Sequence, residues 1–275
     1  MRTLLIGTVV GSVNRTWLRR LLAPLGKAKL NETDLLVSLA EAMRLQGVMI
    51  DVGARYGTSL APFLRRGWQV FAFEPDPANR RVLRWLRPWL PAFEVDARAC
   101  SDEPAEGVTF FVNSGHSAVS SLLSFDAGHQ PGQTVDVTTL DLALSEHGVE
   151  SVDVLKIDAE GYDLHVLRGL DLQGPLRPKL IMCEFDGGKV ANGGHEFREL
   201  VSVMTDAGYR VIVSEWYPID KYGGSHKWRA LEWYPHELAD PLSHGNVIAI
   251  ARDVPAEVVE PVLADWSGAM ARGGE

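Results

Sequence analysis

The stretch from residue 48 to residue 77 constrains the fold of this chain more than any other. It reads VMIDVGARYGTSLAPFLRRGWQVFAFEPDP, with apolar runs at 48–52 and 69–73. A glycine-containing loop and a helical segment separate the two runs, and an acid, Glu74, follows the second. This order predicts a strand, loop, helix, strand unit. In such a unit the loop and the helix N-terminus approach a ligand and the acid binds a ribose diol, so we expect a nucleoside-containing cofactor.

The spacing within the loop favours one class of cofactor. The dinucleotide fingerprint G-x-G-x-x-G is not met, because Asp51 and Tyr56 stand where its first and third glycines belong. A pyrophosphate at this loop would face the carboxylate of Asp51. S-adenosylmethionine has no phosphate, and it carries an ammonium and a sulfonium that an acid favours. The loop therefore predicts S-adenosylmethionine, with an NAD-dependent oxidoreductase as the alternative and an ordinary glycine turn as a third interpretation.

Strands and helices alternate along most of the chain. Further strands are predicted at 92–96, 152–158, 179–185, 209–213 and 246–250, helices at 77–86, 141–147 and 195–207, and an antiparallel hairpin at 108–113 and 134–140. Such alternation predicts a mostly parallel sheet that binds its ligands at the carboxyl ends of the strands. Five acids stand at such ends: Asp51, Glu74, Asp96, Asp158 and Glu184.

The first 47 residues are predicted to form a helical extension of a domain that spans residues 48–275. A helix at 15–30 is interrupted at Pro24, and its basic face either is solvated or touches a membrane surface. A second helix, at 31–46, has Asn31 or Thr33 as its N-terminal cap.

Composition excludes several classes of protein. The chain has 27 basic and 36 acidic residues, a formal net charge of −9, which argues against nucleic acid as the main partner. Its two cysteines form no C-x-x-C pair, and no apolar run is long enough for stable membrane insertion. We expect a cytoplasmic protein that acts on a small or neutral molecule.

Two blocks of the sequence resemble the FkbM family of S-adenosylmethionine-dependent O-methyltransferases. The first is DVGARYGTSLAPFLRRGWQVFAFEPDP, and the second is VTTLDLALSEHGVESVDVLKIDAEGYDLHVLRGL followed by RPKLIMCEF. The resemblance covers roughly residues 48–185. It implies a class I methyltransferase (Rossmann-like) α/β fold, with helices on both faces of a seven-stranded, mostly parallel sheet whose last strand is antiparallel. It also implies methylation of a hydroxyl on a sugar or another natural product.

The resemblance also assigns roles by position. It implies that Asp51, Gly53 and Gly57 lie under the methionine part of the donor and that Glu74 holds the ribose hydroxyls. Asp158, Glu160 and Gly161 belong to the KIDxEG motif beside the methyl group. The predicted donor site comprises Asp51, Gly53, Arg55, Gly57, Ser59, Glu74, Asp76, Asp96, Ser121 and Asp158.

Methyl transfer to an oxygen needs aligned reactants, a base and a shielded pocket. Asp158 and Glu160 are the first candidates for the base, although Asp158 can instead bind the donor's amino group and Glu160 can complement a helix N-terminus. Lys156 either pairs with Asp158 or polarises the acceptor oxygen. His226 is a further candidate base, with a surface histidine as the alternative.

Two further hypotheses concern a metal and a lid. Asp158, Glu184 and Asp186 can form an oxygen-ligand Mg²⁺ site, although acids at strand ends are common without metal. The aromatic-rich insertion at 216–245 is predicted to be a lid that stacks on a saccharide acceptor. Its alternatives are a homodimer interface and a self-packed cap, and a non-catalytic module with the same fold is the third functional hypothesis.

Overall fold

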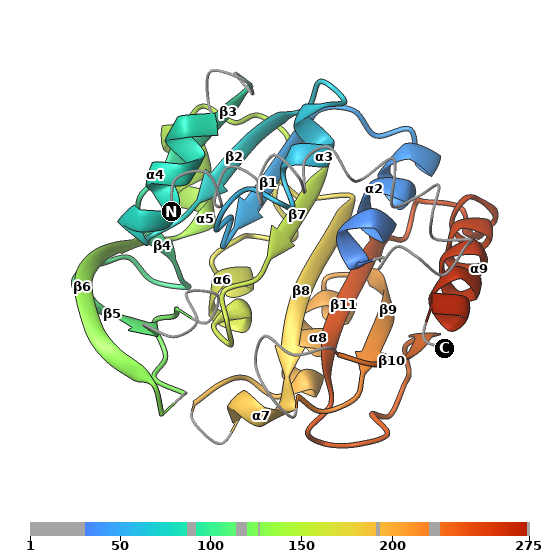
Figure 1. Cartoon of the computed structure of the whole chain (residues 1–275). Helices are drawn as coiled ribbons and strands as arrows, with labels where there is room; N and C mark the ends of the chain where they lie inside the picture. The colour runs from blue at the N-terminus through green and yellow to red at the C-terminus, as the bar shows by residue number, and fades with distance from the viewer. Residues whose placement is uncertain are drawn as a thin grey trace.

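The centre of the molecule is a twisted sheet with the strand order β10-β9-β11-β8-β7-β1-β2-β3 (Figure 1). The computed structural model describes residues 31–86, 92–113, 120–125, 127–190, 193–219 and 226–273, so the predicted helix at 15–30 lies outside the described residues. The strands are β1 (Val48–Val52), β2 (Gln69–Phe73), β3 (Phe93–Asp96), β7 (Val154–Ile157), β8 (Leu180–Asp186), β9 (Tyr209–Trp216), β10 (Trp228–Trp233) and β11 (His244–Ala251).

The sheet confirms the predicted fold and corrects its strand count. In the order β3, β2, β1, β7 and β8, neighbouring strands pair in parallel. Strand β11 runs antiparallel to both β8 and β9. The prediction of seven strands is wrong, because β10 adds an eighth strand antiparallel to β9. It lies inside the segment predicted to be a lid, where the aromatic residues hide the strand pattern.

Helices cover both faces of the sheet, as alternation along the strands requires. Met49 belongs to the core under one face and its neighbour Ile50 to the core under the other. The first face carries α2 (Glu32–Ala42), α3 (Ala61–Leu64), α4 (Pro77–Leu86) and α9 (Ala256–Gly273). The second carries α5 (Leu140–Glu146), α6 (Asp163–Arg168) and α8 (Phe197–Asp206), and the single turn α7 (Gly187–Val190) follows β8 directly.

Helix α2 is anchored to the sheet at its N-terminus. Asn31 and Asp34 form a reciprocal capping box, which satisfies two backbone N–H groups. Glu32, the first residue of the helix, is buried and accepts hydrogen bonds from Ser214 and from the indole of Trp216 on β9. Burial raises the pKa of Glu32, although these hydrogen bonds oppose that shift. The helix thus belongs to the core of the sheet domain.

A second, smaller sheet lies beside the main one (Figure 1). It contains β4 (Ala99–Cys100), β5 (Ala105–Asn113) and β6 (His129–Thr138). Strands β5 and β6 pair antiparallel, which confirms the predicted hairpin. The amide of Gln133 on β6 donates to the carbonyl of Pro75 after β2, so this sheet is attached near the carboxyl end of the main one.

The loop after β1 approaches the loop after β7 more closely than any side chain allows. Gly53 has a φ of +79°, and a Cβ at this position would lie 2.0 Å from the carbonyl oxygen of Asp158. Glycine is therefore required here both by its backbone conformation and by the space. This contact brings the two predicted motif loops together.

We predict that Gly53→Ala destabilises the protein far more than Gly67→Ala. Gly67 has nearly the same φ, +80°, but a Cβ there would meet nothing within 4 Å. Gly67→Ala therefore reports only the backbone cost, about 1–2 kcal/mol. Gly53→Ala must also displace the β7 loop, and we expect roughly 2 kcal/mol more. Urea unfolding of both variants measures the difference, and equal losses would contradict the close approach.

Candidate functional site

A cleft opens at the carboxyl ends of β1, β2 and β7, between the main sheet and the smaller sheet. The loops after β1 and β7 form one side, and residues of β4 and β5 form the other. The residues of the cleft that bear on function are Thr33, Gly53, Arg55, Ser59, Glu74, Asn79, Ser120, Ser121, Lys156, Asp158 and Glu160. The topology of parallel strands places such a site at this edge of the sheet.

A buried ion network joins the central strands below the cleft. The Nζ of Lys156 lies 3.2 Å from Asp51 Oδ1 and 3.4 Å from Asp158 Oδ2. Ser59 donates to the other oxygen of Asp51 over 2.5 Å. Burial lowers the pKa of the Lys156 ammonium, but the two carboxylates more than reverse this effect and raise it overall. Lys156 therefore stays charged and serves as the ion-pair partner of both acids, as one of the two interpretations predicted.

Glu74 directly follows β2 at the cleft and is held by the backbone around it. Its carboxylate accepts hydrogen bonds from the backbone N–H of Arg55 at 2.7 Å and that of Asp76 at 2.8 Å. Burial raises the pKa of Glu74 to about 6, and these hydrogen bonds oppose the shift. Each oxygen keeps further acceptor capacity. Glu74 is thus a fixed, ionisable acceptor in the position predicted for a ribose-binding acid.

Two serines, Ser120 and Ser121, also line the cleft. Ser121 is buried, donates to the carbonyl of Ala159 over 3.1 Å and accepts from the N–H of Leu123. The hydroxyl of Ser120 is buried and has no hydrogen-bond partner within the described part of the chain. A buried polar atom without a partner is costly. An orphaned hydroxyl facing a cleft suits a ligand with polar groups, such as the amino-acid end of S-adenosylmethionine.

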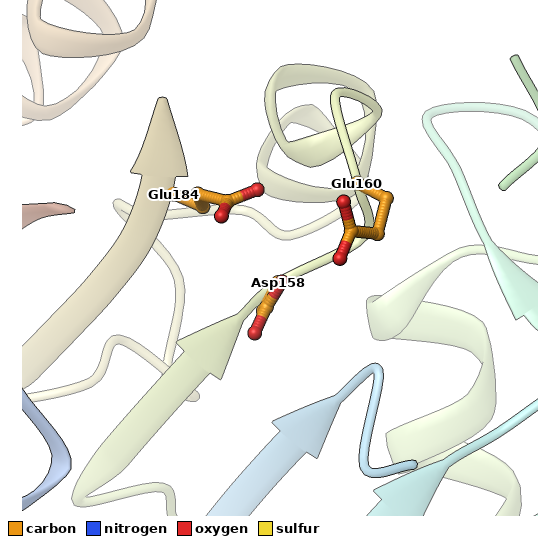
Figure 2. Close-up of side chains that lie close together, drawn as sticks. All are labelled: Asp158, Glu160 and Glu184. Atoms are coloured by element: carbon orange, nitrogen blue, oxygen red, sulfur yellow. The ribbon is translucent and has the colours of Figure 1, made fainter. Parts of the chain in front are cut away.

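Three carboxylates meet at the end of the cleft beside β8 (Figure 2). Asp158 follows β7, Glu160 lies in the next turn, and Glu184 comes from β8, with ligand oxygens within 4.8 Å of one another. Burial raises the pKa of Glu160 to about 7 against the opposing charge of Lys189, whose Nζ lies 2.7 Å away. Burial likewise raises the pKa of Glu184, which Lys189 contacts at 2.9 Å.

The geometry does not support the predicted Mg²⁺ site. Asp186 is not part of the carboxylate triplet, since Glu160 takes the third position. The ammonium of Lys189 lies against Glu160 and Glu184 and 3.6 Å from Asp186. It already supplies positive charge to three of these acids. A divalent cation would have to share this space with a buried ammonium.

Besides Asp51, Gly57, Glu184 and Asp186, three predicted site residues are absent from the lining of the cleft. Asp96 is held by the guanidinium of Arg98 and by the imidazole of His147, and burial opposes but does not cancel the lowering of its pKa by these partners. Asp76 caps its own turn by accepting from the N–H of Ala78. The ring of His226 lies 5.2 Å from that of His244, near the amino end of β11. None of the three is among the residues that line the cleft, so their predicted roles have no support from its geometry.

Most aromatic residues of the predicted lid serve the fold. Trp228 packs edge-on against Trp266 of α9, and Trp233 donates to Glu260. Trp216 donates to Glu32, and Tyr217 stacks under the guanidinium of Arg229 at 4.0 Å with 40% of its surface exposed. Tyr222 lies outside the described residues. No residue of 216–245 in the described part lines the cleft, so the lid stays a prediction.

Sequence reasoning missed two structural groups of the site. Asp163 is fully buried and accepts hydrogen bonds from the N–H groups of Ala159 and Glu184, which ties the β7 loop to β8. Lys189 is the only lysine or arginine within ten residues after the acid end of β8, in the run EFDGGK. That position was a usable signal, because a basic residue after several clustered acids is a natural ion-pair partner. Thr33 and Asn79, which also line the cleft, carried no signal.

We predict that His244 makes stability depend on pH below neutrality. Burial lowers the pKa of His244 to about 4 in the folded protein, although the charge of Asp186 opposes this shift. In the unfolded chain a histidine has a pKa of about 6.5. Between these values the unfolded chain binds more protons, so stability falls as pH falls from about 6.5 towards 4. From pH 7 to pH 5 the wild type should lose about 2 kcal/mol more than His244→Gln. Urea unfolding at both pH values measures this, and equal losses would contradict it.

This chain is similar to proteins of one methyltransferase family. The model of the FkbM methyltransferase domain matches residues 51–211. Among solved structures, an FkbM methyltransferase from Methylobacillus flagellatus KT is 16% identical with a TM-score of 0.42. The match covers 74% of this chain and 43% of that protein's chain. This chain therefore spans less than half of that protein.

Two other solved structures show similar degrees of likeness. Precorrin-6y C5,15-methyltransferase from Geobacter metallireducens GS-15 is 14% identical with a TM-score of 0.42, covering 82% of this chain and 91% of its own. The N-terminal domain of EvdMO1, solved in the presence of SAH and D-fucose, is 11% identical with a TM-score of 0.42. The match covers 82% of this chain and 84% of that domain. A search of curated protein sequences gave no match. With the family model matching more than half of its length, this chain belongs to the FkbM methyltransferase family, which implies S-adenosylmethionine as its methyl donor.

Proposed function

We propose that this methyltransferase transfers its methyl group to a hydroxyl of a saccharide, a glycoside or a related natural product. The observation that carries the proposal is the position of Glu160. Its carboxyl lines the cleft beside Asp158, and burial raises its pKa to about 7 against the charge of Lys189. A group with a pKa near the working pH is best suited to accept a proton during the reaction.

The donor would be held by residues of the β1, β2 and β7 loops. Glu74 would accept hydrogen bonds from the ribose hydroxyls, and the loop at Gly53 would let the backbone approach the donor. Ser120 and Asp158 would receive its charged amino-acid end, since the first has a free hydroxyl and the side chain of the second is 40% exposed. When bound, the donor supplies a methyl group on a positively charged sulfur.

The chain's own contribution is alignment and proton removal. When the acceptor oxygen takes the methyl carbon and the carbon–sulfur bond breaks, the hydroxyl proton would pass to the carboxylate of Glu160. Lys156, 3.4 Å from Asp158 Oδ2, keeps that carboxylate directed at the donor's amino-acid end and so helps to align the donor with the acceptor. The acids at this end of the cleft outnumber Lys156 and Lys189, and their negative charge favours a cationic donor and a neutral acceptor over a polyanion.

One earlier expectation supports this choice of acceptor without testing it. The net charge of −9 disfavours nucleic acid. Within the described residues no helix is long and apolar enough to cross a bilayer. A homodimer and a cytoplasmic location stay predictions.

We predict that Glu74→Gln weakens donor binding. The substitution removes a charged acceptor and turns one oxygen into a donor that faces a backbone N–H. The Kd for S-adenosylhomocysteine should rise about tenfold or more, because hydrogen bonds to charged groups contribute about 1.5–3 kcal/mol. Calorimetric titration measures this Kd. The control is Glu94→Gln, which changes an exposed acid on neighbouring β3 and should leave the Kd unchanged. An unchanged Kd for Glu74→Gln would argue against this donor site.

We further predict that Glu160→Gln lowers kcat while donor affinity stays unchanged. Loss of a proton-accepting group should cost about 10²–10⁴-fold in kcat. A screen of glycosides with a labelled methyl donor identifies an acceptor, and NMR of the product establishes whether oxygen carries the methyl group. Methylation of carbon or nitrogen, or full turnover by Glu160→Gln, would refute the proposal.

A further inference from the structure

Lys189 is a buried cation beside the carboxylates of Glu160 and Glu184. It lies in α7, the single turn after β8, and is among the most fully buried side chains of the described residues. Its aliphatic part packs against Gly161, where a Cβ would lie 3.1 Å from Lys189 Cδ. Its ammonium lies 5.0 Å from the ring centroid of Phe125. The side chain is therefore enclosed on several sides and has one fixed position.

The charges around this ammonium are arranged as they are around a metal ion. Glu160 and Glu184 contact Nζ at 2.7 and 2.9 Å, and Asp186 lies at 3.6 Å. The nearby carboxylate of Asp158 belongs to the same group of oxygens as Glu160 and Glu184. Three carboxylate oxygens this close repel one another unless a cation lies among them. Lys189 supplies that cation from within the chain.

The backbone of Glu160 shows why its side chain needs this partner. Glu160 has a φ of +55°, a left-handed conformation that is uncommon for a residue with a Cβ. Such a conformation persists only where the surrounding structure holds it. The Glu160 carboxylate accepts a hydrogen bond from Lys189 Nζ over 2.7 Å. The ammonium thus fixes the direction in which the carboxyl faces the cleft.

We propose that Lys189 is a positioning residue that takes the place of a divalent metal: it holds Glu160 towards the acceptor hydroxyl, and it makes methyl transfer independent of added metal. This inference rests on the proposed function for the part that concerns turnover. The part that concerns the cation site does not depend on any acceptor.

The first test uses the unchanged protein and the variant Lys189→Met. Methionine keeps the apolar stem that packs on Gly161 and removes the charge. Turnover of the wild type should not change in excess EDTA. Lys189→Met should bind S-adenosylhomocysteine with a Kd close to that of the wild type, while kcat falls about 10–100-fold with little change in KM.

The second test measures Mn²⁺ binding by electron paramagnetic resonance, with the metal alone and no acceptor. Removal of the ammonium leaves a site of three carboxylates, so Lys189→Met should bind Mn²⁺ with a Kd of about 10⁻³ M or below. The wild type should bind at least tenfold more weakly. The control is Lys179→Met, which removes an exposed lysine at the start of β8 that pairs with Asp253, and it should match the wild type in every measurement.

Lys189→Met leaves several buried acids without their partner and can fail to fold. For that case the double variant Lys189→Met with Glu184→Gln removes one charge of each sign. It should fold, bind S-adenosylhomocysteine normally and keep the low kcat, because Glu160 still lacks its cation.

Four results would overturn the proposal: loss of wild-type turnover in EDTA, wild-type kcat in folded Lys189→Met, wild-type kcat in the double variant, or no gain in Mn²⁺ affinity in folded Lys189→Met. If no hydroxyl acceptor is ever found, the proposed function fails, whereas the Mn²⁺ measurement still decides whether Lys189 fills a cation site.

Discussion

The buried ammonium of Lys156 is the constraint on which the rest of the site depends. It lies between Asp51 on β1 and Asp158 after β7, and the buried charges of Lys156 and Asp51 would be costly without a partner. The pairing fixes the carboxyl ends of the two central strands relative to each other. Gly53 can then pass against the carbonyl of Asp158, and the two loops form one continuous wall of the cleft. The position of Glu160, two residues further on, follows from the same contact.

A second lysine repeats this arrangement one strand further along the sheet. Lys189 joins the loop after β7 to the end of β8, as Lys156 joins β1 to β7. Asp163 adds two hydrogen bonds to backbone N–H groups across the same gap. The acids here outnumber the two ammonium groups, so the region keeps a negative charge. A positively charged donor would lower the repulsion within it, and this suits S-adenosylmethionine better than a phosphate-bearing cofactor.

The order of strands and helices could be predicted because local patterns determine it. Apolar runs of the right length ended in acids, and the parallel topology brings such ends to one edge of the sheet, so Asp51, Glu74 and Asp158 were identified as neighbours. Asp96 met the same criterion but lies outside the cleft, because Arg98 and His147 hold it. No pattern at Asp96 itself distinguishes a ligand-binding acid from one in an ion pair.

The parts that could not be predicted depend on contacts between distant segments. The link from Glu32 to Ser214 and Trp216 spans most of the described chain, and it explains why α2 belongs to the core. The triplet of Asp158, Glu160 and Glu184 depends on the left-handed turn at Glu160, which nothing in its side chain favours. The metal site predicted from the sequence therefore contained Asp186 in the place that Glu160 takes in the structure.

Strand β10 has a consequence for how this protein behaves among its own copies. Without it, β9 would end the sheet with an apolar strand whose backbone N–H and C=O groups were unpaired, and such an edge readily recruits a strand from another chain. β10 satisfies those groups within the molecule. Its own pairing is irregular between Trp228 and Ala230, and it carries charged Arg229 and Glu232, features that make it a poor template for further pairing. The aromatic insertion thus helps to keep the folded chain from aggregating through its sheet.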